Sequence, residues 1–140
     1  STRDRAGDAQ GRPVDLGSIY WLYRQIVMNE HEQARASERA EILKALAHPT
    51  RVYIVDLIAR EGSRCVCELT ERIGADTSTV SRHLSQLKSA GILSSRKEGT
   101  TVYYDLTCDC IGTFMHGLDN VLRARHQRRQ AAFSAAVGEE

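Results

Sequence analysis

The chain has 140 residues and a formal net charge of +1, so we expect one domain with a hydrophobic core rather than two. No apolar run approaches the roughly 20 residues that span a bilayer, and the polar first twenty residues are unlike a signal peptide. We therefore expect a cytoplasmic protein with no membrane partner. The near-neutral charge excludes a globally basic surface of the kind that many nucleic-acid-binding proteins show.

The first half of the chain predicts a tail followed by three helices. Residues 1–16 are polar with interspersed glycines, which is typical of a disordered tail. Apolar residues spaced three and four apart predict an amphipathic helix over residues 18–27, too short to be stable alone. The next helix is expected to begin at a cap on Ser37 and to end before Pro49. Pro49 then suits the first turn of a helix that Gly62 ends.

The second half predicts two short helices, a hairpin and a long helix. The first short helix should end at Gly74, and the second should begin at a cap on Asp76 or Thr77 and end at Gly91. Strands at 93–97 and 101–106, a helix from 111 and a flexible tail over 131–140 should follow. The fold class is therefore mainly helical with a small β hairpin, in one domain over residues 17–130.

This order of helix, short turn, helix and hairpin is that of a winged helix-turn-helix. In that fold the second helix lies in the major groove of double-stranded DNA, and its first residues reach base edges. Residues 77–104 carry four Lys or Arg against one acid. The alternative interpretation of the second helix is an ordinary solvent-exposed helix that does not bind DNA. We expect DNA contacts from the polar and basic side chains on this helix and from the basic hairpin turn. The histidine among them could instead be a packing residue. The candidate residues are Thr77, Ser78, Thr79, Ser81, Arg82, His83, Ser85, Gln86, Arg96 and Lys97.

The four cysteines form two Cys-x-Cys pairs, Cys65/Cys67 and Cys108/Cys110. Side chains two apart on a regular α-helix point about 200° apart, so each pair can hold one ion only in extended chain. Thiolates favour soft ions: three suit arsenite or antimonite, and four suit cadmium, lead or zinc.

The segment before Cys65 should pair beside the strand at 101–106, so a site that uses both pairs within one subunit is feasible. A site across a dimer is less direct. One alternative is that the cysteines pack as small apolar residues. Another is a thiol-redox or persulfide sensor that closes a disulfide between the two pairs. His116 and His126 on the last helix are a weaker zinc candidate. No arrangement typical of a catalytic site is present, so we expect no enzyme.

Three segments of the sequence, at residues 46–51, 65–69 and 78–84, resemble the ArsR-type (ArsR/SmtB) family of arsenic- and metal-responsive repressors, over roughly residues 37–122. The resemblance implies a homodimer joined by its N- and C-terminal helices. It also implies that the dimer binds operator DNA without ligand and leaves it when thiolates capture a soft ion. Simple arsenic repressors carry a third cysteine where this chain has Thr70, so a third ligand must come from elsewhere.

Overall fold

The computed structural model describes residues 15, 17–21 and 30–138. The chain divides into two compact units, residues 1–40 and 41–140, and each is described by itself. In the first unit residues 17–21 are helical and exposed, whereas the rest of the helix predicted over residues 18–27 lies outside the described residues. The tail predicted over residues 1–16 also lies almost wholly outside them.

Helix α2 (Glu30–Leu46) begins earlier than predicted. The predicted cap at Ser37 is wrong, because Ser37 lies inside the helix. Glu30 and Glu32 stand in the first turn, where negative charge is stabilised by the positive end of the helix dipole. The alanine, glutamine, glutamate and arginine residues that follow have high helix propensity, so nothing interrupts the helix before Leu46.

Helix α3 (Pro49–Glu61) has the predicted start and end. The Nδ1 atom of His48 accepts a hydrogen bond of 3.1 Å from the backbone N–H of Thr50, so His48 is the N-cap. Pro49 occupies the first turn, where its missing N–H costs no hydrogen bond. Gly62 ends the helix at a φ of 85°, a conformation that favours glycine.

The two short helices also have their predicted boundaries. Helix α4 (Val66–Ile73) follows the two-residue strand β1 (Arg64–Cys65) and ends at Gly74 in the left-handed conformation. Helix α5 (Thr77–Ser89) begins after Asp76, whose carboxylate accepts a hydrogen bond of 2.8 Å from the backbone N–H of Thr79. Asp76 rather than Thr77 is therefore the cap.

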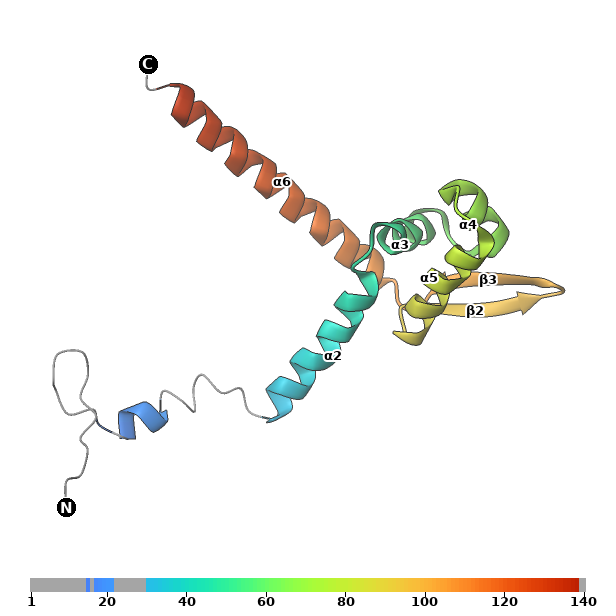
Figure 1. The fold of residues 1–140 in the computed structure, drawn as a ribbon, viewed down its shortest axis with the longest axis horizontal. Helices are drawn as coiled ribbons and strands as arrows, with labels where there is room; N and C mark the ends of the chain where they lie inside the picture. Colours follow the sequence, from blue (N-terminus) through green and yellow to red (C-terminus); the bar gives the residue numbers. More distant parts are fainter. Residues whose placement is uncertain (1–14, 16, 22–29, 139–140) are drawn as a thin grey trace. The chain divides into compact units, whose positions relative to one another are not determined.

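Strands β2 (Leu93–Glu98) and β3 (Thr101–Leu106) form the hairpin, and β1 adds to it in the antiparallel order β1-β3-β2. The hairpin lies beside α5 (Figure 1). Helix α6 (Cys110–Val137) packs on α3 near its start and continues past residue 130, where the domain was expected to end. The mainly helical fold with a small hairpin is confirmed.

One hydrophobic core holds the second unit together. Leu69, Leu84 and Leu87 are fully buried, where α4 packs on α5 and β3 and α5 packs on α3 and β2. Burial of each such side chain contributes about 1.5–3 kcal/mol to stability. Four of the other core residues come from α3, and the rest lie in or next to α2, α5, β2 and α6: Leu46, Ile54, Val55, Leu57, Ile58, Val80, Ile92, Leu93 and Met115. Among the described residues, no helix is both long and apolar enough to span a membrane.

Candidate nucleic-acid interface and cysteine pairs

The start of α5 presents hydroxyl groups that are already hydrogen-bonded. The Oγ of Ser78 and the Oγ1 of Thr79 both donate to the carboxylate of Asp76, the latter over 2.7 Å. These bonds hold the pKa of Asp76 well below its usual range. The two hydroxyls can therefore accept hydrogen bonds, whereas their protons are engaged. Thr77 is exposed at the first position of the helix.

The middle of α5 has one exposed face and one face turned toward α3. Arg82 and Ser85 are exposed, and Ser81 is half-buried. The His83 ring lies 4.5 Å from the His48 ring, centroid to centroid, and its Nδ1 is 3.4 Å from Nη1 of Arg51. Burial lowers the pKa of His83, and His48 and Arg51 act in the same direction. His83 is therefore half-buried and packs against His48 and Arg51.

Gln86 is held by a partner that sequence reasoning missed. Its Oε1 accepts a hydrogen bond of 2.6 Å from Nη1 of Arg51, while Nε of Arg51 donates to the carbonyl of Ala45. Arg51 thus links the end of α2 to α5. Arg51 was visible only as part of a resembling segment, because a contact across 35 residues of sequence has no local signal.

The two basic residues of the hairpin differ in their surroundings. Arg96 Nε donates to Oε1 of Glu98 over 3.0 Å, and its Nη1 pairs with Asp105. The hydrogen bond to Glu98 raises the pKa of Arg96, and Asp105 adds to the effect. Lys97 is exposed and makes no ion pair within the described part of the chain. The exposed, uncompensated cation of this turn is therefore Lys97.

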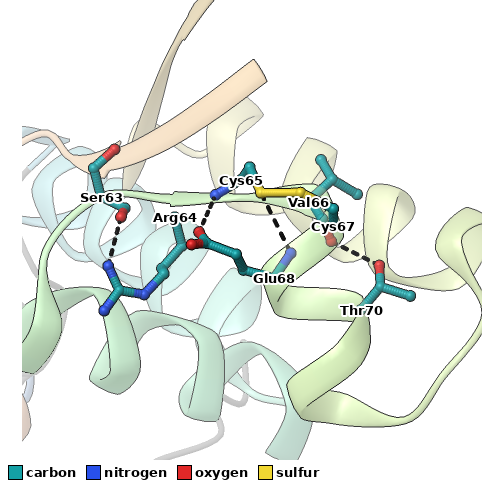
Figure 2. The surroundings of a disulfide bond; sticks show 7 residues. All are labelled: Ser63, Arg64, Cys65, Val66, Cys67, Glu68 and Thr70. Carbon is teal, nitrogen blue, oxygen red and sulfur yellow. Dashed lines mark hydrogen bonds between the residues drawn. A yellow bond between two sulfur atoms is a disulfide. The ribbon is translucent and has the colours of Figure 1, made fainter. Parts of the chain in front are cut away.

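Cys65 has three structural roles at once (Figure 2). It ends β1, it is the N-cap of α4, and it forms a disulfide with Cys67 at a Cα–Cα distance of 5.4 Å. Its Sγ accepts a hydrogen bond of 3.3 Å from the backbone N–H of Glu68, whose Oε2 in turn accepts from the Cys65 N–H over 3.0 Å. Cys65 is buried and Cys67 exposed. The backbone is extended at Cys65, as the spacing argument required, whereas Cys67 already lies within α4.

The second pair lies where β3 gives way to α6. Cys108 and Cys110 form a disulfide with a Cα–Cα distance of 5.1 Å, and the backbone N–H of Cys110 donates to Cys108 Sγ over 3.1 Å. Both residues are exposed. His116 and His126 lie further along α6, and neither joins a group of potential metal ligands in the described residues.

The structure brings each cysteine pair together but does not join the two pairs. Arg64 lies opposite Tyr104, and Cys65 lies opposite Tyr103. The chain therefore runs from Cys65 toward the hairpin turn, while β3 runs the other way toward Cys108. Positions 103 and 108 are five steps apart along the chain, which corresponds to roughly 17 Å when extended. No cluster of three or more possible metal ligands occurs within the described ranges.

Comparison with known proteins places this arrangement in a family. Residues 48–95 match the family described as "Bacterial regulatory protein, arsR family". An HTH-type transcriptional regulator of Methanocaldococcus jannaschii is 38% identical over 94 residues, which is 67% of this chain and all of that protein. The arsenic resistance transcriptional regulator ArsR1 of Pseudomonas putida is 51% identical over 65 residues, 46% of this chain and 51% of that protein.

A cadmium resistance regulator (CadC homolog) of Staphylococcus aureus is 46% identical over 67 residues, 48% of this chain and 55% of that protein. The chain thus spans only about half the length of the last two relatives. Among solved structures, the homodimeric winged helix-turn-helix DNA-binding domain of Mb0332 from Mycobacterium bovis matches with a TM-score of 0.62 at 30% identity, over 73% of this chain and 93% of that one. Together these matches show that the chain belongs to the arsR family of bacterial regulatory proteins.

Proposed function

We propose that the protein is a transcriptional repressor that binds operator DNA as a homodimer and is released when reduced cysteine thiolates bind a soft ion. We propose arsenite or antimonite as the inducing ion, and cadmium, lead or zinc as the alternative. One observation carries the proposal: Cys65, one of a thiol pair, is itself the N-cap of the first helix of the reading motif. The names of the arsenic and cadmium resistance regulators that resemble this chain support it.

The DNA-binding surface that we propose is the exposed face of α5 together with the hairpin turn. Arg82, Ser85 and Lys97 are exposed and suit base edges and phosphates. The hydroxyls of Ser78 and Thr79 are available as acceptors. Because Glu98 and Asp105 offset the charge of Arg96, we assign the phosphate contact of the turn to Lys97, with Arg96 shaping the turn. Similarly, His83 and Gln86 shape the helix through Arg51.

The dimer interface that we propose includes the first part of α6. Large apolar side chains are exposed there, with Phe114 at 41% and Leu118 at 39% exposure, and Val121 and Leu122 follow. Contiguous exposed apolar side chains mark protein–protein contacts. Ile19, exposed in the short helical segment at 17–21, belongs to the N-terminal contribution. A symmetric pair would place two reading helices on half-sites about one turn of DNA apart.

Ion capture changes the chemistry of the Cys65 cap. Arsenous acid condenses with two thiols to give a dithiolate arsenic hydroxide and two waters, and a third thiol displaces the last hydroxyl as water. Cys65 Sγ then has to satisfy the ion geometry as well as the Glu68 N–H. Because α4 packs on α5 through the buried Leu69, a shift at this cap reaches the reading helix. Couplings of this kind are typically about 1–3 kcal/mol.

Cys108 or Cys110 would supply the third or fourth sulfur. The antiparallel register separates these residues from Cys65 within one subunit. A site that uses both pairs therefore requires either a rearrangement of the chain or the Cys108/Cys110 pair of the other subunit in the dimer. Both versions keep Cys65 and Cys67 at the centre of the site.

A second candidate is a thiol-redox sensor of the same fold, because each Cys-x-Cys pair is joined as a disulfide in the structure. In that mechanism a pair of thiols gives two electrons and two protons to an oxidant such as a peroxide, and the disulfide form has a different operator affinity. No ion is needed, so the two candidates make different predictions for the reduced protein.

The deciding experiment uses fully reduced protein under anaerobic conditions. Operator affinity is measured by fluorescence anisotropy with arsenite, antimonite, cadmium, lead and zinc in turn, and sulfur-to-metal absorption is recorded in parallel. The proposal predicts that at least one ion lowers operator affinity at the concentrations that saturate the absorption change. If no ion acted while peroxide alone released the DNA, the redox candidate would replace it.

A further inference from the structure

The outer face of the small sheet connects the cysteine segment to the hairpin turn. Tyr103 in β3 is the register partner of Cys65 in β1 on one side and of Arg96 in β2 on the other. Register partners in an antiparallel sheet project their side chains to the same face. The guanidinium of Arg96 lies 5.2 Å from the centroid of the Tyr103 ring, consistent with this placement.

Arg96 also bonds to the segment that leads into Cys65. Its Nη1 donates to Oγ of Ser63 over 3.0 Å. Ser63 lies two residues before Cys65 and immediately before strand β1, as Figure 2 shows. Strands β1 and β2 do not pair with each other, because β3 lies between them. The bond therefore crosses β3 and joins the cysteine segment directly to the hairpin.

Only an arginine can make this set of contacts. Its Nε holds Glu98 while its Nη1 reaches both Asp105 and Ser63. The guanidinium offers five N–H donors in a rigid plane, whereas a lysine has a single nitrogen on a flexible stem. Arg96 is thus held by two carboxylates of the hairpin and by Ser63 of the cysteine segment.

We propose that Arg96, through Ser63, is a positioning residue that makes the hairpin turn follow the cysteine segment when an ion is captured. This inference rests on the proposed ion-triggered release. In the protein without DNA the turn is free to move with β1, so the Ser63–Arg96 bond survives ion capture. When DNA holds the neighbouring Lys97 in place, the turn cannot follow, and the bond has to break. The complex that contains both DNA and ion is therefore destabilised, which is what releases the operator.

The test is Ser63→Ala, which removes the link and leaves every charge of the hairpin in place. Operator affinity is measured with reduced protein, with and without saturating sodium arsenite or cadmium chloride, and ion affinity is measured without DNA. Operator affinity without ion and ion affinity without DNA should both stay as in the unmodified protein. The ratio of operator affinities without and with ion should fall roughly 2- to 10-fold, the factor that one net hydrogen bond represents.

Ser95→Ala is the matched control. Ser95 lies next to Arg96 on β2, and its Oγ accepts a hydrogen bond of 2.7 Å from Nζ of Lys88 in α5 rather than from β1. This variant also loses a hydrogen bond to a serine hydroxyl. Its ratio of operator affinities without and with ion should equal that of the unmodified protein. Because linkage is reciprocal, Ser63→Ala should also raise the ion affinity of the operator-bound protein by the same factor by which the ratio falls.

The outcomes separate this inference from the proposed function. If the unmodified protein releases DNA and Ser63→Ala has the same ratio, the link carries no coupling and the inference is wrong, while the proposed function stands. A lower operator affinity of ion-free Ser63→Ala with an unchanged ratio makes Ser63 merely structural, and also overturns the inference. If no ion lowers the operator affinity of the unmodified protein, both the proposed function and the inference fail.

Discussion

Lys97 rather than Arg96 should determine how strongly operator binding depends on salt. Each phosphate contact made by a cation contributes about 0.9 to the slope of log affinity against log salt. A dimer presents Lys97 twice, so Lys97→Ala should flatten the slope by roughly 1.8. Between 50 and 200 mM salt the unmodified protein should then lose about 12-fold more affinity than the variant, since each contact corresponds to about 3.5-fold.

Arg96 needs a different substitution, because removing its charge alone would expose two carboxylates to the DNA. The double variant Arg96→Gln with Glu98→Gln removes one positive and one negative charge and leaves the net charge of the turn unchanged. Since Arg96 is already paired with Glu98 and Asp105, this variant should keep the unmodified salt slope. Lys44→Ala, on exposed α2, is the control for a lysine outside the interface.

The assay is operator binding by fluorescence anisotropy at five or more salt concentrations, with reduced protein and no added ion. An unchanged slope for Lys97→Ala would show that the hairpin turn does not contact phosphate. A slope for the Arg96/Glu98 double variant that falls as far as that of Lys97→Ala would show that Arg96 contacts phosphate despite its carboxylate partners. Either result would refute the assignment drawn from the ion pairs.

Three further predictions concern the elements around the two sites. Leu84→Ala removes a fully buried side chain and should lower the free energy of unfolding by about 2–5 kcal/mol in urea denaturation. The pKa of Asp76 is lowered in the folded state. The Asp76 carboxylate therefore stabilises the fold fully above the ordinary aspartate pKa, and this stabilisation is lost as the pH falls through the lowered pKa. Asp76→Asn should remove this contribution to the acid dependence of the thermal unfolding midpoint. Cys65→Ser retains a capping oxygen and should keep stability and operator binding but lose release by ion, whereas Cys65→Ala should also cost about 1 kcal/mol of stability.

Most helix boundaries could be predicted because they depend on one or two neighbouring residues. Pro49 lies in the first turn of α3 as expected, and Gly62, Gly74 and Asp76 each occupy the cap position expected of them. The start of α2 and the end of α6 were missed for the opposite reason. No proline or glycine interrupts the strongly helix-forming residues there. The possible cap at Ser37 and the polar residues of α6 therefore suggested boundaries that the backbone has no cause to form.

Only those features of the candidate site that depend on residues close together in sequence could be predicted. Spacing alone indicated that Cys65 and Cys67 need extended chain, and the backbone is extended at Cys65 but helical at Cys67. The contacts of Arg51 with Gln86 and of Arg96 with Ser63 join residues more than thirty apart in sequence. Such contacts depend on how helices and strands pack, which no motif encodes. The separation of the two cysteine pairs follows from the antiparallel direction of β1, a tertiary feature as well.

The central claim is that thiolates capture the ion that releases the operator. The most direct test compares the unmodified protein with a variant in which all four cysteines are serine, both reduced and bound to operator DNA. Titration with arsenite, and separately with cadmium, should dissociate the unmodified protein and leave the variant bound at the same concentrations. Dissociation of the cysteine-free variant at those concentrations would contradict the claim.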